Sequence, residues 1–192
     1  MSMTPSADTQ IPATLESLRQ ALPEWARDLK LNLQALLASG GALTDSQRWG
    51  VAVASALASR NAQLSRAIQA EAARAVEPSV LDDARAAASV MAMNNIYYRF
   101  RHQVGDPAYS KMGARLRMNR LAQPATTRAE LELFSLAVSA INGCESCVQS
   151  HERAVREGGL SEEHVHEAVR VAAVIHAAAI SLEAMDASNS SL

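Results

Sequence analysis

The sequence has no surplus of either charge, no long apolar run and few aromatic residues. Its 18 basic and 20 acidic side chains give a formal net charge of −2. This balance gives no reason to expect nucleic acid or an anionic membrane as a partner. No apolar run approaches the length that spans a bilayer. Residues 1–10 lack both the basic start and the apolar stretch of a secretory signal. Cytoplasmic residence, with no membrane contact, is therefore the default expectation.

Cysteine is nearly absent, because the chain has only Cys144 and Cys147, three positions apart. A structural disulfide normally closes a longer loop, since a short loop removes little entropy from the unfolded chain. A chain of 192 residues is also long enough to bury the core of one domain without such staples. In a reducing compartment, the spacing of this pair favours a chemical role over a structural one.

Alternating strand patterns are also missing, and the commonest residue, alanine, is a strong helix former. We therefore predict an all-α, single-domain fold of about eight to ten helices. We expect residues 1–12 to be disordered, residues 13–186 to form the helical domain and residues 187–192 to fray. Apolar spacing and capping signals predict helices near 15–22, 23–37, 44–58, 62–76, 79–105, 127–141, 144–158 and 161–185, with a loop and one short helix between 105 and 124.

The redox chemistry is predicted at the start of the helix that follows Gly143. Cys144 lies in its first turn, where unpaired backbone amides favour a thiolate. Cys147 is about one turn further on, so the two sulfurs can share a face and close a disulfide. His151 follows after another turn, where an imidazole can take the thiol proton or stabilise the thiolate. The thiolate is the form that attacks peroxides and disulfides.

Glu132 lies on the preceding helix, twelve residues before Cys144. If the two helices are antiparallel and joined at Gly143, its carboxylate lies opposite the early turns of the second helix. There it could orient His151 or accept a relayed proton. Glu130 is an alternative carboxylate, but its position in a capping box gives it a structural role.

The long helix before residue 105 carries four further residues of interest. Asn94 and Asn95 are unusual in an apolar helix and could either hydrogen-bond near the site or serve helix packing. Met91 is interpreted as a packing residue and Arg99 as a surface charge.

Two less reactive interpretations of the cysteine pair remain open. Cys144, Cys147, His151 and Glu132 could together supply four zinc ligands, but structural zinc sites usually draw on a second ligand cluster, and none is visible. The cysteines could also be an inert, packed pair. A redox dithiol that binds no metal is the preferred hypothesis.

The motif of a glutamate, eleven residues, C-x-x-C, three residues and a histidine resembles that of the alkylhydroperoxidase D (AhpD) family, part of the carboxymuconolactone decarboxylase-like superfamily. Glu132, Cys144, Cys147 and His151 match every position. The resemblance extends over nearly the whole chain and includes LPE at 22–24, DLKLNL at 28–33, MNN at 93–95, LRMN at 116–119 and AVSAINGC at 137–144.

This resemblance implies a helical homo-oligomer, with a trimer favoured. It implies an antioxidant alkyl hydroperoxide reductase that is lipoyl-dependent and also reduces the peroxiredoxin AhpC. The implied electron donor is dihydrolipoamide on the lipoyl domain of a 2-oxoacid dehydrogenase component, with no tightly bound cofactor.

The resemblance also implies roles for the site residues. Cys147 attacks the peroxide and forms a sulfenic acid, Cys144 is the proton donor and resolving thiol, and His151 and Glu132 complete the relay. The position of Cys144 at the helix start argues instead for Cys144 as nucleophile, whereas His151, one turn from Cys147, agrees with the resemblance. Some AhpD sequences carry histidine where this chain has Ser146, a possible relay residue that cannot act as a base near neutral pH.

Two rival functions follow from the same residues. A carboxymuconolactone decarboxylase-type enzyme is disfavoured, because that chemistry gives no reason for a vicinal dithiol. A non-catalytic helical protein that binds zinc or senses redox state is the alternative from a different class.

Overall fold

The computed structural model describes residues 14–37 and 40–189, and these residues form an all-α, single-domain fold, as predicted. The described part contains nine α-helices, within the predicted number, and two short 3-10 helices. Residues 1–12, expected to be disordered, lie outside the described part. The helices are α1 (Leu15–Ala21), η1 (Glu24–Ala26), α2 (Arg27–Leu37), α3 (Asp45–Ser59), α4 (Ala62–Ala75), α5 (Pro78–Val104), α6 (Pro107–Lys111), η2 (Asn119–Ala122), α7 (Arg128–Ile141), α8 (Glu145–Glu157) and α9 (Glu162–Asn189).

The helix boundaries follow the local signals to within a few residues. Both predicted capping boxes form, at Thr44 ahead of α3 and at Thr127 ahead of α7. Pro78, expected only to stop the preceding helix, is itself the first residue of α5, where its missing N–H is not needed. At the other end of the chain, α9 continues to Asn189, so residues 187–189 of the expected tail are helical.

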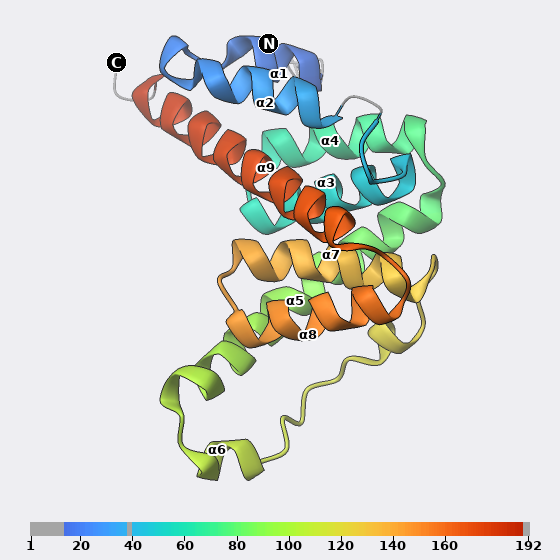
Figure 1. Ribbon diagram of the computed structural model, residues 1–192. Helices are drawn as coiled ribbons and strands as arrows, with labels where there is room; N and C mark the ends of the chain where they lie inside the picture. Colours follow the sequence, from blue (N-terminus) through green and yellow to red (C-terminus); the bar gives the residue numbers. More distant parts are fainter. Residues whose placement is uncertain (1–13, 38–39, 190–192) are drawn as a thin grey trace, which may run out of the picture.

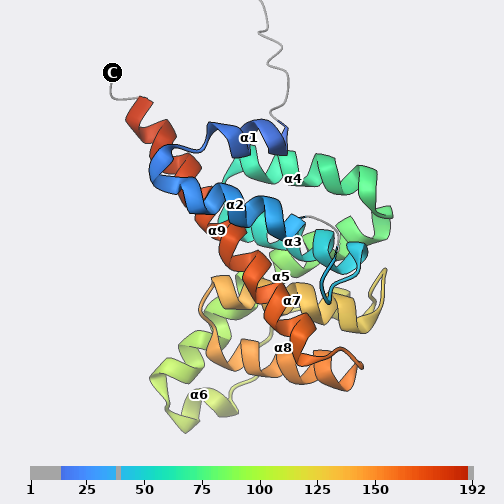
Figure 2. The same ribbon diagram turned by 45° about the horizontal axis from the view of Figure 1, so that its top comes forward.

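The core is built around α3, which packs against α5, α7 and α9. The approach of α3 to α7 is close at Gly50, because a Cβ there would lie 2.1 Å from Cζ of Phe134. In Figures 1 and 2, α1, α2 and α4 lie at one end of the molecule, α6 lies at the other, and α9 runs from the first end towards α7 and α8. In the hairpin of α7 and α8, both helices pack against α5.

Helix α9 is long and apolar enough, by length and composition alone, to cross a bilayer, which the sequence analysis did not anticipate. Its apolar side chains have another explanation, because Val171, Ile175 and Leu182 are buried in the core. The helix packs against α2, α3 and α7. The core helix of a globular protein passes the same length test.

A fully buried carboxylate on α5, Asp83, holds the chain between η2 and α7 in place. It accepts hydrogen bonds from the backbone amides of Ala125 (3.0 Å) and Thr126 (2.8 Å), from the Thr126 hydroxyl (2.7 Å) and from Arg120 (2.5 Å). Burial by itself raises the pKa of Asp83, but these donors outweigh it and hold the pKa below its usual value. The stability that Asp83 contributes is therefore present above the pKa of an unfolded aspartate and is lost as the pH falls through the lower folded value.

Replacement of Asp83 by asparagine is expected to lower the free energy of unfolding by about 3 kcal/mol, because an amide NH2 would face donors in a buried site. Urea unfolding near neutral pH measures this loss. The matched control is Asp82→Asn, since the neighbouring carboxylate is largely exposed and makes only a 3.4 Å pair with Arg85. Equal stabilities for the two variants would contradict the anchoring role of Asp83.

Candidate active site

The turn between α7 and α8 places the two cysteines. Gly143 has a φ of +64°, a left-handed conformation that glycine adopts without strain. Cys144 follows as the N-cap of α8, and its amide donates to the carbonyl of Ser139 at 3.1 Å. The helix thus begins at Glu145, one residue after the predicted position.

Cys144 and Cys147 form a disulfide, with their Cα atoms 5.3 Å apart. Their surroundings differ, because Cys144 is fully buried whereas Cys147 is 7% exposed. Cys147 lies in a pocket of about 320 Å³ between α5 and α8, and Cys144 is not among its lining residues. Cys147 is therefore the cysteine of the pair that lines the pocket. The lining residues are Met91, Asn94, Tyr98, Ser146, Cys147, Ser150 and His151.

A histidine–carboxylate pair lies beside this pocket. His151 Nδ1 is 2.6 Å from Oε2 of Glu132, and Arg128 donates to the other carboxylate oxygen at 2.5 Å. Burial raises the pKa of Glu132, but the hydrogen bond and charge of His151, followed by those of Arg128, bring it below the usual value. Because Glu132 is ionised, the Nδ1–H of His151 donates to it. The predicted antiparallel approach of the two helices is confirmed, and Glu130 has its predicted capping role.

The other ring nitrogen of His151 meets a residue that sequence reasoning had assigned to packing. Nε2 lies 3.2 Å from the sulfur of Met91, which is a weak acceptor. With Nδ1–H donated to Glu132, Nε2 of the neutral imidazole carries no proton, so its approach to Met91 is a packing contact. His151 and Met91 line the same pocket as Cys147.

Comparison with known proteins shows the family of this chain. Residues 107–189 match the model of the carboxymuconolactone decarboxylase family. Over 171 residues the chain is 64% identical to the alkyl hydroperoxide reductase AhpD of Anaeromyxobacter sp. (strain K), which covers 89% of this chain and 91% of that protein. The chain belongs to the AhpD family. It is also 51% identical over 174 residues to the AhpD of Methylobacterium sp. (strain 4-46), covering 91% of this chain and 98% of that protein.

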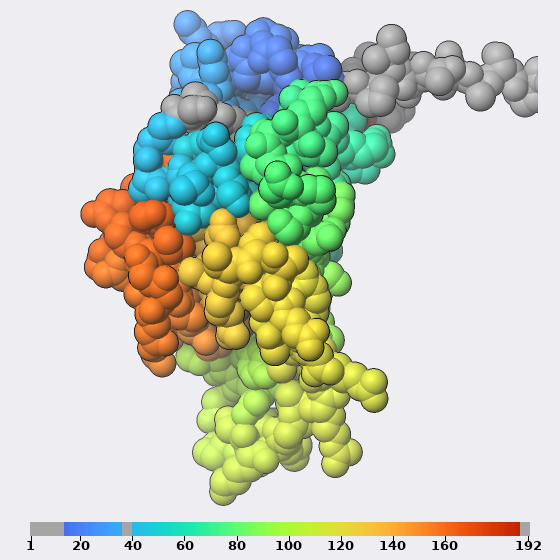
Figure 3. All heavy atoms as spheres, turned by 90° about the vertical axis from the view of Figure 1, so that its right-hand side faces the viewer, coloured from blue at the N-terminus to red at the C-terminus, as the bar shows by residue number. Residues whose placement is uncertain are grey.

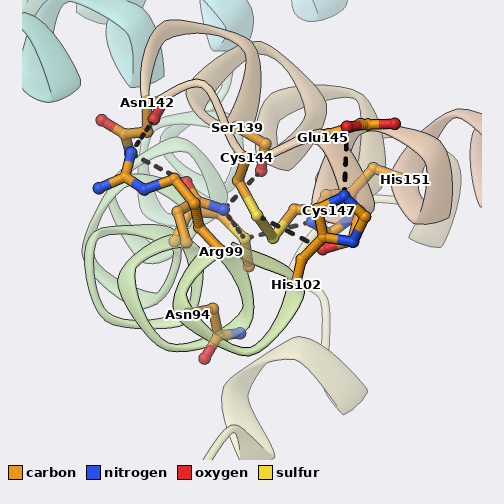
Figure 4. Close-up of a disulfide and its surroundings, with 12 residues drawn as sticks. Asn94, Arg99, His102, Ser139, Asn142, Cys144, Glu145, Cys147 and His151 are labelled. Carbon is orange, nitrogen blue, oxygen red and sulfur yellow. Dashed lines mark hydrogen bonds and ion pairs between the residues drawn. A yellow bond between two sulfur atoms is a disulfide. The ribbon is translucent and has the colours of Figure 1, made fainter. Parts of the chain in front are cut away.

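In this AhpD-family chain, α5 also supplies a polar network that supports the turn before Cys144. The Asn95 amide donates to the Ser139 hydroxyl at 2.9 Å and accepts from the Asn142 side chain at 2.9 Å. Arg99, predicted to be a surface charge, is instead half-buried and donates to the carbonyl of Asn142. Figure 4 shows Arg99 extending from α5 towards this turn. The sequence signal that could have grouped these residues is their spacing of four, because it places Met91, Asn95 and Arg99 on one face of the helix.

Four other polar side chains lie around the disulfide: Ser146, His102, Glu145 and Asn94. The Ser146 hydroxyl is 3.8 Å from the sulfur of Cys144, a weak contact, and lines the pocket. His102 of α5 lies 3.3 Å from Glu145, and both side chains are mostly exposed. Asn94 lines the pocket and donates to the sulfur of Met118 at 3.0 Å, so it is Asn95 rather than Asn94 that supports the turn.

A zinc site would need three or more histidine, cysteine or acidic side chains close together. Within 14–37 and 40–189 there is no such group. Both sulfurs that the zinc hypothesis required are joined to each other, and Glu132 is already paired with Arg128 and His151.

Proposed function

We propose that the chain is an antioxidant alkyl hydroperoxide reductase that works by a dithiol–disulfide cycle of Cys144 and Cys147. The observation that carries this proposal is the asymmetry of the pair: Cys147 lines a pocket beside the His151–Glu132 pair, while its partner sulfur is buried behind it. The names of the AhpD relatives support the same reaction.

In the oxidative half-reaction, His151 takes the proton of the Cys147 thiol, and Glu132 stabilises the imidazolium that results. The thiolate attacks the terminal oxygen of ROOH, the O–O bond breaks, and the leaving alkoxide takes the proton from His151 to form ROH. Cys147 is left as a sulfenic acid. The sulfur of Cys144 then attacks that of Cys147, the S–O bond breaks, and hydroxide leaves as water with the Cys144 proton. Two electrons have passed from the dithiol to the peroxide.

In the reductive half-reaction, a dithiol reopens the disulfide. Its thiolate attacks the sulfur that the pocket exposes, Cys147, and Cys144 leaves as a thiolate. The second thiol of the donor attacks the mixed disulfide, so that the donor becomes a disulfide and Cys147 is released. Dihydrolipoamide is the proposed donor, presented on the lipoyl domain of a 2-oxoacid dehydrogenase component, with AhpC as a further electron acceptor. No tightly bound cofactor is needed, because the cysteine pair itself stores both electrons. We place this cycle in the cytoplasm.

A coupled assay tests the proposal. The purified chain is mixed with an organic hydroperoxide, NADH, lipoamide dehydrogenase and lipoamide, and consumption of NADH is followed. Turnover that stops when lipoamide is omitted is the expected result. Absence of turnover with wild-type protein, despite titratable thiols after reduction, would refute the lipoyl-linked peroxidase and favour a redox adapter.

We further propose that the chain forms a homo-oligomer, with a trimer favoured. Ile96, Phe100 and Val104 form an exposed apolar stripe on α5, and Ile96 alone is 62% exposed. Tyr109 of α6 contacts Phe100 with ring centroids 5.4 Å apart, which extends the stripe. Figure 3 shows this part of the chain, in yellow-green, standing out below the body. Neighbouring exposed apolar side chains on a projecting element support an interface.

Aspartate at Ile96 is expected to dissociate the oligomer, because the interface would then bury an unpaired charge. Light scattering coupled to size-exclusion chromatography measures the mass. Aspartate at Ile180, an equally exposed apolar residue on α9, is the matched control. A wild-type monomer, or an unchanged mass for the first variant, would contradict this interface.

A further inference from the structure

The two sulfurs of the disulfide have different electrostatic surroundings. His151, which is paired with Glu132, lines the same pocket as Cys147. Cys144 is buried on the other side, at the end of α8, and no side chain caps the amides of that helix end. A sulfur at the N-cap position lies next to the positive end of the helix, which favours its thiolate.

A second positive group lies on the same side. Arg99 donates to the carbonyl of Asn142, two positions before Cys144, so its guanidinium is fixed close to the start of α8. Asn95 bonds to the side chains of Ser139 and Asn142 and so supports the turn between α7 and α8. Arginine stays charged throughout the pH range of thiol chemistry. Arg99 is therefore a permanent positive charge at the turn that leads into Cys144.

The remaining charged groups around Cys144 do not cancel this effect. Among the residues labelled in Figure 4, the other charged or titratable groups are His102 of α5 and Glu145 and His151 of α8, and Ser139 of α7 is neutral. Glu132 of α7 is paired with His151 and Arg128. Glu145 is largely exposed and faces His102 at 3.3 Å, so solvent and that partner both weaken its field at the sulfur. His151 is oriented by Glu132 towards the pocket.

We propose that Arg99 is a positioning residue for Cys144: it fixes the α7–α8 turn and stabilises the Cys144 thiolate, while His151 and Glu132 activate Cys147. This inference rests on the proposed dithiol cycle. It assigns a different set of residues to each thiol. When a donor thiolate attacks Cys147, the S–S bond breaks and its electron pair passes to the sulfur of Cys144. A stabilised thiolate leaves faster, so Arg99 speeds reduction of the disulfide. The same stabilisation keeps Cys144 ready to attack the sulfenic acid.

This division of roles removes a conflict in the sequence analysis. The helix start argued for Cys144 as the more acidic thiol, whereas the motif assigned the peroxide attack to Cys147. The two statements are compatible, because the sulfur that leaves and the sulfur that attacks the peroxide need different properties. Cys144 is fully buried and follows the turn to which Arg99 is bonded. Cys147 lines the pocket that His151, the proposed base, also lines.

The test isolates each thiol. In a Cys147→Ser background, where only Cys144 titrates, Arg99→Gln is expected to move the midpoint of the thiolate absorbance up by about one pH unit, because an adjacent positive charge is lost. Arg99→Lys keeps the charge, so its Cys144 midpoint is expected to stay close to that of the protein with Arg99. In a Cys144→Ser background, Arg99→Gln leaves the Cys147 midpoint in place. With both cysteines present, Arg99→Gln slows reduction by dihydrolipoamide about threefold.

Two results would overturn the inference: an unchanged Cys144 midpoint, or equal shifts of both cysteines. Circular dichroism checks that the variants are folded, and Asn95→Ala supplies a second variant that loosens the turn without removing charge. It is expected to move the Cys144 midpoint less than Arg99→Gln does, and a larger shift would assign the effect to the turn alone. Since the titrations contain no hydroperoxide, their outcome is separate from that of the peroxidase assay.

Discussion

Serine at Cys147 is expected to abolish hydroperoxide turnover, with a fall of roughly three orders of magnitude or more, because the attacking thiolate is removed. The coupled NADH assay measures this loss. The physical reason is that Cys144, the thiol that remains, is fully buried and does not line the pocket, so it cannot take over the attack on the peroxide. Full activity in this variant would refute the assignment of the nucleophile.

The matched control is Cys144→Ser. This variant keeps Cys147, the thiol that lines the pocket, and is expected to consume about one equivalent of hydroperoxide and then stop, because no second sulfur closes the disulfide. A dimedone adduct on Cys147 identifies the trapped sulfenic acid by mass spectrometry. If instead Cys144→Ser fails to react and Cys147→Ser forms the adduct, the roles of the two cysteines are the reverse of those proposed.

Loss of the carboxylate behind His151 has the second largest expected effect. Glu132→Gln is expected to lower kcat/KM about a hundredfold, a usual contribution for a group that orients a general base. The amide can still hydrogen-bond to His151, but it no longer stabilises the imidazolium. Initial rates at several hydroperoxide concentrations measure the effect. A change of less than threefold would mean that His151 works without Glu132.

The same substitution has a predicted pH signature. The folded pKa of Glu132 is lowered, so its stabilising contribution is present above the pKa of an unfolded glutamate and disappears as the pH falls through the folded value. Melting temperatures of wild type and Glu132→Gln should therefore differ most near neutral pH and converge in acid. Arg128→Gln is the matched control, because this partner of Glu132 is 64% exposed and its pair is worth less than about 1 kcal/mol. Its activity should stay within about threefold of wild type.

The sequence alone determined the parts of this protein that depend on neighbours along the chain. The helices of the described residues, the caps at Thr44 and Thr127 and the end of α7 before Gly143 all follow from local backbone and side-chain chemistry. The spacing of the cysteines likewise placed both on one turn, where they form the predicted disulfide. An antiparallel pair of helices joined at Gly143 predicted that Glu132 would meet His151, nineteen residues away in sequence, and the motif of the family agrees.

Only the tertiary structure decided which helix covers this hairpin and which sulfur is exposed. Helical spacing places Met91, Asn95 and Arg99 on one face of α5, but it says nothing of what that face meets. Their contacts with His151, Ser139 and Asn142 arise because α5 packs across both helices of the hairpin. Exposure of Cys147 rather than Cys144 has the same origin, since burial is set by the packing of distant elements and local spacing is identical whichever sulfur faces the pocket.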